Sequence, residues 1–281
     1  MKDTNVPFIT LNNGVQMPQL GLGVWKAQDG EEVEAAVTAA LEAGYRLIDT
    51  AMVYGNEAGV GNAIRASGIP REEIFVTTKL WNSDQGKDNV RPAFEASLKR
   101  LGLDYIDLYL IHWPMPARNL YVETWLEFEK LYAEKVARSI GVSNFQIEHL
   151  ENLAQHSSVV PVVNQIELHP GFSQEKLRNY GKARSIYIES WKPLGGAQGS
   201  ILADTTLSRI AEAHARTTAQ IVIRWHLQHD LIVIPKSVHE ERIKQNIDVF
   251  DFELSKDDMA AIDNLENGQR LGADPDSLNS Y

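Results

Sequence analysis

Residues 31–50, EEVEAAVTAALEAGYRLIDT, contain the unit from which the rest of the fold can be read. Residues 31–44 have helical periodicity and end at Gly44, a residue type that commonly terminates helices. The next residues, YRLIDT, form a short apolar run that closes on polar side chains. A helix followed at once by such a run predicts one repeat of an α/β fold with a parallel sheet.

Runs of the same kind recur along the whole chain, with helical segments between them. The eight runs are QLGLGVW, YRLIDT, IFVTTK, IDLYLIHW, SIGVSN, PVVNQIE, IYIESW and LIVIPKS. Near-continuous apolar strands are typical of parallel sheets that are covered on their faces. Eight strand–helix units favour an α/β fold closed into a (β/α)8 TIM barrel over an open sheet. No linker or change of composition interrupts the 281 residues, so we expect a single domain over residues 1–281.

Two segments lie outside the repeat. Before the first strand, FITLNNGVQMP predicts a β-hairpin that turns at Asn13–Gly14 and is placed to close the bottom of the barrel. After the eighth strand, LSKDDMAAIDNL predicts an extra helix, because Ser255 and Asp258 have the spacing of a capping box. A polar tail, residues 268–281, follows that helix.

Composition limits the classes of function. A formal net charge of −11 argues against a nucleic-acid partner or an anionic membrane. The absence of cysteine excludes disulfides, thiolate metal sites and cysteine nucleophiles. No apolar run approaches the ~18 residues of a membrane span, and the N-terminus lacks the apolar stretch of a signal peptide. We therefore expect a cytoplasmic protein that acts on a small molecule. No long exposed apolar helix demands a partner, so we expect a monomer.

Polar residues collect where the predicted strands end, which is where barrels of this type carry their chemistry. Each of them alone could be an ordinary solvated or core residue, but together they predict one functional rim. They are Asp49, Tyr54, Lys79, His112, Ser143, Asn144, Asn164, Gln165, Ser190, Trp191, Lys236 and Ser237.

Four of these residues suit proton donation to a carbonyl group. A free tyrosine, with a pKa near ~10, is a weak acid, and a nearby ammonium lowers that pKa. Lys79 would supply the ammonium for Tyr54, and Asp49 would hold Lys79 through a buried ion pair. His112 would orient the carbonyl. No metal-ligand spacing is present, and we interpret His226 and His229 as surface residues of a helix.

A dinucleotide would need an unusual site, because no G-x-G-x-x-G segment opens a βαβ unit. We interpret Gly21 and Gly23 as small residues at a tight place in the barrel. After strand eight, Ser237 and Glu240 have capping-box spacing, and a helix N-terminus there would attract a phosphate. Lys236 and Arg242 would add the charge that a ribose 2′-phosphate needs, which favours NADPH over NADH.

The segments IDTAMVYGNE, TTKLW, LIHWP, GVSNF, NQIELHP and IPKSV..ERIKQN resemble signature segments of the aldo-keto reductase family and occur in family order. The similarity is strongest to the bacterial branch that includes 2,5-diketo-D-gluconate reductases. The resemblance implies a (β/α)8 barrel and NAD(P)H-dependent reduction of aldehydes and ketones to alcohols. It also implies a catalytic tetrad of Asp49, Tyr54, Lys79 and His112.

The same resemblance implies a cofactor site. Ser143, Asn144 and Gln165 would hold the nicotinamide carboxamide, and Trp191 would stack on the ring. The loop of residues 193–200 would cross the pyrophosphate. Lys192 departs from the small residue expected beside it. The remaining cofactor positions are Pro193, Leu194 and Gly195 in the loop, with Lys236, Ser237, Val238, Arg242, Gln245 and Asn246 around the adenosine 2′-phosphate and adenine.

For the substrate, Trp25, Trp81 and Trp113 would line an open mouth around His112. Such a pocket suits small polar carbonyls such as keto-sugar acids, α-diketones or methylglyoxal-like aldehydes. Arg118 could attract an anionic substrate, but we interpret it as a surface residue.

Two other functions stay open. One is a cofactor-sensing regulatory member of the same family with little turnover. The other is a carbohydrate hydrolase with Asp49 and Glu189 as its two carboxylates, although Asp49 is expected to be occupied by Lys79.

Overall fold

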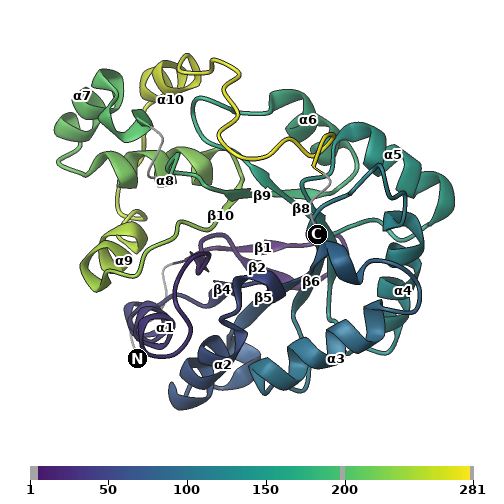
Figure 1. The fold of residues 1–281 in the computed structure, drawn as a ribbon. Coiled ribbons are helices and arrows are strands. Elements are labelled where there is room, and N and C mark those ends of the chain that lie inside the picture. Colours follow the sequence, from purple (N-terminus) through teal and green to yellow (C-terminus); the bar gives the residue numbers. More distant parts are fainter. Residues whose placement is uncertain (1–5, 197–199, 279–281) are drawn as a thin grey trace.

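The computed structural model describes residues 6–196 and 200–278, which form a parallel sheet surrounded by helices (Figure 1). The sheet strands are β3 Leu22–Gly23, β4 Leu47–Asp49, β5 Phe75–Leu80, β6 Leu108–Ile111, β7 Ile140–Ser143, β8 Val163–Glu167, β9 Tyr187–Trp191 and β10 Ile232–Val233. Each strand pairs with the next in chain order, always in parallel. Parallel bridges Leu20–Val233 and Gly23–Lys236 join the first strand region to the last. The predicted TIM barrel is confirmed.

The helices cover the outside of this barrel. They are α1 Glu31–Ala43, α2 Glu57–Ala66, α3 Val90–Leu101, α4 Tyr121–Ala133, α5 Ile147–His156, α6 Glu175–Ala183, α7 Thr205–Ala213, α8 Thr218–Gln228, α9 Glu240–Ile247 and α10 Lys256–Asp263. Short 3-10 helices are η1 Met52–Tyr54, η2 Arg71–Glu73, η3 Asn82–Asp84 and η4 Ser200–Ala203. Between β9 and β10 the chain forms both α7 and α8, where the repeat predicts one helix. No helix in the described part of the chain is long and apolar enough to cross a bilayer.

The N-terminal hairpin closes one end of the barrel. Strands β1 Phe8–Thr10 and β2 Gln16–Pro18 pair antiparallel, as predicted, and Gly14 in the turn has a φ of 85°. Leu11 and Met17 are buried in one cluster with residues from the amino-terminal ends of the barrel strands, including Phe75 and Leu108. Water is thereby excluded from this end of the barrel, and polar groups are concentrated at the carboxyl end.

The first strand region approaches its neighbours closely because it carries glycines. A Cβ atom on Gly21 would lie 2.4 Å from Leu47 Cγ, and one on Gly23 would lie 3.0 Å from the Ile234 carbonyl oxygen. These distances are too short for a side chain to be added without movement. The interpretation of both glycines as close-packing positions is confirmed.

The interpretation of His226 as a surface residue is wrong. Its side chain is fully buried in α8, and both ring nitrogens lie within hydrogen-bond distance of backbone carbonyls, those of Val222 and Leu168. Burial lowers the pKa of His226 to about 4, so the ring is neutral at pH 7. His229 is partly exposed and contacts Asp263. Spacing alone did not reveal that the His226 face of the helix turns toward the barrel.

Of the two predicted capping boxes, one is confirmed. Ser255 accepts a hydrogen bond from the Asp258 N–H, and Asp258 bonds back to the Ser255 N–H. The other is wrong, because α9 begins at Glu240 and the Ser237 hydroxyl instead accepts from the N–H of His239. The strand-to-helix connection makes a local turn there before the helix begins.

Candidate active site

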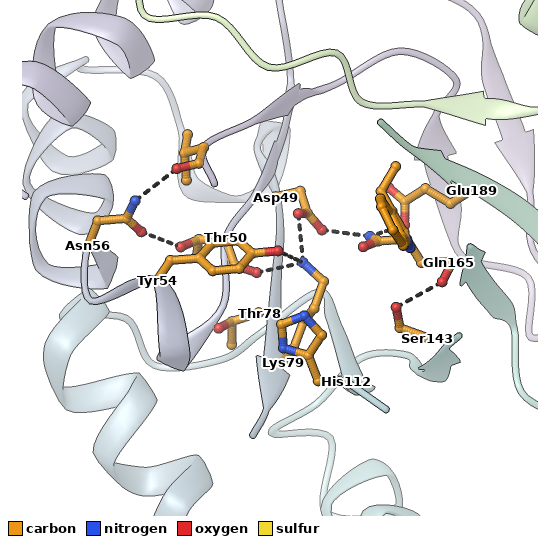
Figure 2. A network of polar contacts seen from close by, with 12 residues as sticks. Asp49, Thr50, Tyr54, Asn56, Thr78, Lys79, His112, Ser143, Gln165 and Glu189 are labelled. Carbon is orange, nitrogen blue, oxygen red and sulfur yellow. Dashed lines mark hydrogen bonds and ion pairs between the residues drawn. The ribbon is translucent and has the colours of Figure 1, made fainter. Parts of the chain in front are cut away.

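The four residues proposed for proton transfer meet at the carboxyl end of the barrel (Figure 2). Asp49 is the last residue of β4, Lys79 lies in β5, and His112 directly follows β6. Tyr54 ends the short helix η1, which follows β4. Parallel strands bring these positions to one rim although they are far apart in the sequence.

Lys79 is the centre of the group. Its side chain is fully buried, and its ammonium donates to Asp49 Oδ1 at 2.6 Å and to the Thr50 carbonyl at 2.9 Å. The hydroxyl oxygen of Tyr54 lies 3.5 Å away. A lysine ammonium has three donors, and these contacts use all of them. The predicted buried ion pair between Asp49 and Lys79 is confirmed.

Burial and the neighbouring charges shift the pKa values of this group in opposite directions. Burial lowers the pKa of Lys79, but Asp49, Tyr54 and Glu189 together outweigh it and raise that pKa, which keeps the ammonium charged. Burial raises the pKa of Tyr54, and Lys79 opposes it without reversing it. The predicted lowering of the Tyr54 pKa is therefore wrong in its net direction. The phenol remains protonated at neutral pH, as a proton donor must be.

A second hydrogen-bond group fixes the loop that carries Tyr54. Buried Asn56 accepts from the Thr50 hydroxyl at 2.7 Å and donates to the carbonyls of Val24 and Ala27 at 2.9 and 3.0 Å. The loop is thus bonded to both β4 and the segment after β3. These bonds fix the two ends of the short segment that carries Tyr54.

His112 lies on the other side of the phenol. Its ring meets that of Tyr54 edge-on at 5.8 Å between centroids and that of Trp81 at 5.1 Å. Burial and the charge of Lys79 hold the pKa of His112 well below its ordinary value. The imidazole is neutral and can offer one N–H to a ligand.

Residues predicted for the nicotinamide lie beside this group. Asn144, in the left-handed backbone region with a φ of 65°, donates to the His112 carbonyl and accepts from the Trp191 indole N–H at 2.8 Å. Ser143 donates to the Gln165 carbonyl at 2.8 Å. The Gln165 side-chain nitrogen donates to Asp49 Oδ2 at 2.8 Å. The catalytic group and these residues thus form one continuous hydrogen-bond network.

The cofactor positions predicted in the loop and after strand eight differ in exposure. Pro193 and Gly195 are buried and Leu194 is half-buried, whereas residues 197–199 of the same predicted loop lie outside the described residues. Beyond β10, Ser237 and Asn246 are buried and Val238 is half-buried, while Lys236, Arg242 and Gln245 are exposed. Within the described ranges neither Lys236 nor Arg242 has a carboxylate partner. Both cations are accessible to a phosphate.

The aromatic residues predicted for the mouth separate into two groups. Trp81 and Trp113 are half-buried, and Trp113 meets Trp191 edge-on at 6.5 Å. Trp25 is 47% exposed, and the Lys26 ammonium makes a cation–π contact with its ring at 4.5 Å from the centroid. Trp81 and Trp113 therefore border His112, and Trp25 lies further out.

Arg118, interpreted from the sequence as a surface residue, is partly exposed, and its guanidinium donates to the Asn82 carbonyl. Arg118 thereby ties the loop after β6 to η3.

The chain matches the model of the aldo/keto reductase family over residues 19–267. It is 50% identical to the glyoxal reductase of Bacillus subtilis, over 99% of this chain and 98% of that protein. It is 51% identical to the methylglyoxal reductase DkgA of Salmonella typhimurium, over 98% of both chains. Among solved structures, a mutant of Gox0644 in complex with NADPH superposes with a TM-score of 0.93 at 48% identity, covering 98% of this chain and 99% of that one.

The chain belongs to the aldo/keto reductase family. The family resemblance inferred from the sequence segments is confirmed, and the closer likeness to 2,5-diketo-D-gluconate reductases stays a prediction. Oxidoreductases of this family act on carbonyl compounds, which agrees with a rim that holds a protonated phenol beside a buried ammonium.

In this aldo-keto reductase the C-terminal tail, yellow in Figure 1, runs from α10 back toward the barrel. It passes close to Trp191, because a Cβ atom on Gly272 would lie 2.4 Å from that ring. Glu167 at the end of β8 accepts from the N–H groups of Leu271 and Gly272 at 2.7 and 2.8 Å. Burial raises the pKa of Glu167, but bonds from His169 and these two N–H groups outweigh it and lower that pKa. Lys192 also donates to the Leu271 carbonyl at 3.3 Å, so its charge anchors the tail. The last tail residues, 279–281, lie outside the described residues.

Sequence reasoning missed Asn56 and Glu167 as parts of the site, and assigned Glu189 only to a hydrolase. Asn56 and Glu167 each lie inside a signature segment, so their position was a usable signal. The contacts of the two carboxyl groups contradict the hydrolase alternative. Asp49 is paired with Lys79, and the amide nitrogen of Gln165 bonds both Asp49 and Glu189, so the space that a glycosidic bond would need between them is filled.

Proposed function

We propose that this aldo-keto reductase uses NADPH to reduce small aldehydes and ketones to alcohols, with Tyr54 as the proton donor. The observation that carries the proposal is the position of the Tyr54 hydroxyl, 3.5 Å from a Lys79 ammonium that is itself paired with Asp49. When bound, NADPH would supply the hydride. The protein's own groups then have to orient the carbonyl and deliver one proton to its oxygen.

The proposed roles follow from charge. Burial keeps Tyr54 protonated before the reaction, and Lys79 favours the phenolate that remains afterwards. His112, held neutral by burial and by Lys79, would donate an N–H to the carbonyl oxygen and orient it. The pocket thus offers two donors to one oxygen, which stabilises the negative charge that develops there during hydride transfer.

NADPH fits the remaining residues. Trp191 is held in place by Asn144 at the barrel mouth, where it can stack on a ring. Lys236 and Arg242, both exposed and close to the start of α9, suit a 2′-phosphate. The Gox0644 structure with bound NADPH supports the same choice. Ser143, Gln165, Ser237, Gln245 and Asn246 complete the proposed site, with the loop of Pro193, Leu194 and Gly195.

For the substrate we propose small polar carbonyls, α-dicarbonyl aldehydes first. The names of the Bacillus subtilis and Salmonella typhimurium relatives, glyoxal reductase and methylglyoxal reductase, support this choice. So do Trp81 and Trp113, whose apolar rings both lie against His112. Keto-sugar acids and α-diketones are the next compounds to test.

The test is NADPH and NADH oxidation by purified protein with glyoxal, methylglyoxal, α-diketones and 2,5-diketo-D-gluconate. We expect turnover with NADPH and at least one dicarbonyl. Tight NADPH binding without turnover of any carbonyl would support the regulatory alternative instead. We further propose that residues 1–281 act in the cytoplasm as a one-domain monomer, which light scattering and cell fractionation can test.

A further inference from the structure

Glu189 is a buried carboxyl group that the proposed mechanism does not use. It lies in β9, two residues before Trp191, and its side chain has no exposed surface. Its Oε2 accepts from the Gln165 side-chain nitrogen at 2.8 Å, and its Oε1 has no hydrogen-bond partner in the described structure. A buried oxygen without a hydrogen bond lowers the stability of the fold, so Glu189 is a candidate for a functional role.

The two carboxyl groups determine which way the Gln165 amide faces (Figure 2). An amide nitrogen has two donors, and here one goes to Asp49 Oδ2 and the other to Glu189 Oε2, both at 2.8 Å. The opposite orientation would place the amide oxygen against two carboxyl groups. The carbonyl oxygen Oε1 is therefore the end of Gln165 that can accept from the amide nitrogen of a nicotinamide.

We propose that Glu189 is a positioning residue for the cofactor and for the proton donor. With Asp49 it holds the Gln165 amide in the orientation that accepts the nicotinamide, and it extends the chain Tyr54–Lys79–Asp49–Gln165 by one ionisable group. This inference rests on the proposed function, because it assigns Gln165 to the nicotinamide.

The charges around Glu189 give the proposal a pH dependence. Burial and Asp49 raise the pKa of Glu189 to about 8, and Gln165 and Lys79 oppose the rise. Asp49 from β4 and Lys79 from β5 are the charged groups that face it. The neighbouring strands contribute neutral Gln165 from β8 and apolar Ile232 from β10. Glu189 is thus neutral at pH 7 and becomes an anion above pH 8, where its charge raises the pKa of Tyr54.

The first experiment measures NADPH binding by quenching of tryptophan fluorescence, without a substrate. Glu189→Met removes one of the two acceptors that orient the Gln165 amide, so we expect NADPH affinity to fall about fivefold, as for loss of one hydrogen bond between neutral groups. Thr77→Val is the matched control. Its hydroxyl is buried in β5 without a partner, and the replacement keeps the shape of the side chain, so we expect binding within about twofold of wild type.

The second experiment uses Glu189→Gln, which keeps an acceptor for Gln165 but cannot ionise. We expect its NADPH affinity to match wild type at pH 7. Between pH 7 and 9, kcat of the wild type should fall about threefold to tenfold more than kcat of Glu189→Gln, since one pKa unit of Tyr54 is tenfold in acidity. Infrared difference spectra of the ligand-free proteins should show a carboxylic acid band that titrates near pH 8 in wild type only.

The results separate this inference from the proposed function. If wild type neither binds NADPH nor reduces carbonyls, the proposed function fails, while the infrared titration still reports on Glu189. If wild type is active but Glu189→Met binds NADPH as Thr77→Val does, the positioning role is wrong. An identical pH profile for wild type and Glu189→Gln would overturn the coupling to Tyr54. Should Glu189→Met fail to fold, Glu189→Gln decides through its pH profile and infrared spectrum.

Discussion

Replacing Lys79 by methionine tests the buried ion pair on which the site depends. The change removes hydrogen bonds to Asp49 Oδ1 at 2.6 Å and to the Thr50 carbonyl at 2.9 Å, and it leaves Asp49 only 2% exposed. Breaking a buried pair on one side costs about 3–5 kcal/mol, because a charge is left without its partner. We expect a loss of that size in the free energy of unfolding at high pH.

The loss should depend on pH, because Asp49 can escape by taking up a proton. Burial already raises its pKa, and removal of Lys79 raises it further. In the folded variant Asp49 then stays protonated at pH values at which the same carboxyl group in the unfolded chain, with a pKa of about 3.9, has lost its proton. The free energy of unfolding of the variant therefore falls as the pH rises above about 3.9. Protonation of Asp49 at about pH 5.5 costs only about 2 kcal/mol, so the variant should be about 2 kcal/mol less stable than wild type at that pH. At about pH 8 we expect it to be about 3–5 kcal/mol less stable than wild type.

The assay is urea unfolding of wild type and variant at both pH values, followed by circular dichroism. The double variant Asp49→Asn/Lys79→Met is the control, since residue 49 then has no carboxylate to protonate and the variant should not show the pH dependence that Asp49 causes. A stability loss that is equal at the two pH values, or that stays below about 1 kcal/mol as for surface pairs, would refute the reasoning. Carbonyl reduction by Lys79→Met should be nearly abolished at either pH.

Three further changes test other parts of the molecule. Tyr54→Phe should lower kcat by about 10²–10⁴, the usual contribution of a general acid, and leave NADPH binding by fluorescence unchanged; retained turnover would remove Tyr54 as the acid. Arg242→Ala should weaken NADPH about tenfold, by loss of one charged hydrogen bond, and leave NADH nearly unaffected; equal losses in titration calorimetry would contradict a 2′-phosphate role. Glu167→Gln replaces a charged acceptor by a neutral one, so hydrogen exchange of the Leu271 and Gly272 amides should become about tenfold faster. Unchanged exchange rates in mass spectrometry would show that Glu167 does not anchor the tail.

Much of the fold was predictable because it depends on local pattern. The alternation of apolar runs and helices, the hairpin turn at Asn13–Gly14 and the helix end at Gly44 each follow from residues close together in the chain. The errors have a different origin. His226 has the spacing of a surface pair, yet packing turns its side chain into the barrel wall. Ser237 has capping spacing, yet the chain makes a local turn before the helix starts.

The candidate site divides in the same way. Asp49, Tyr54, Lys79 and His112 were predictable because each lies at the end of a strand or just after it, and the strands of a barrel share one rim. Their electrostatics were not, because a pKa depends on burial and on neighbours from other strands. The net pKa of Tyr54 lies above its ordinary value for this reason, although Lys79 acts in the predicted direction.

The sequence by itself determined the barrel, the family and the identity of the groups that we propose for the reaction. Residue types and their spacing are properties of short segments, so they can be read from the sequence without a structure. Only the tertiary structure decided that Glu189 shares the Gln165 amide with Asp49, that Glu167 holds the C-terminal tail and that Arg118 bonds the η3 backbone. Each of these contacts joins residues distant in the chain, and closure of the barrel is what brings them within hydrogen-bond distance.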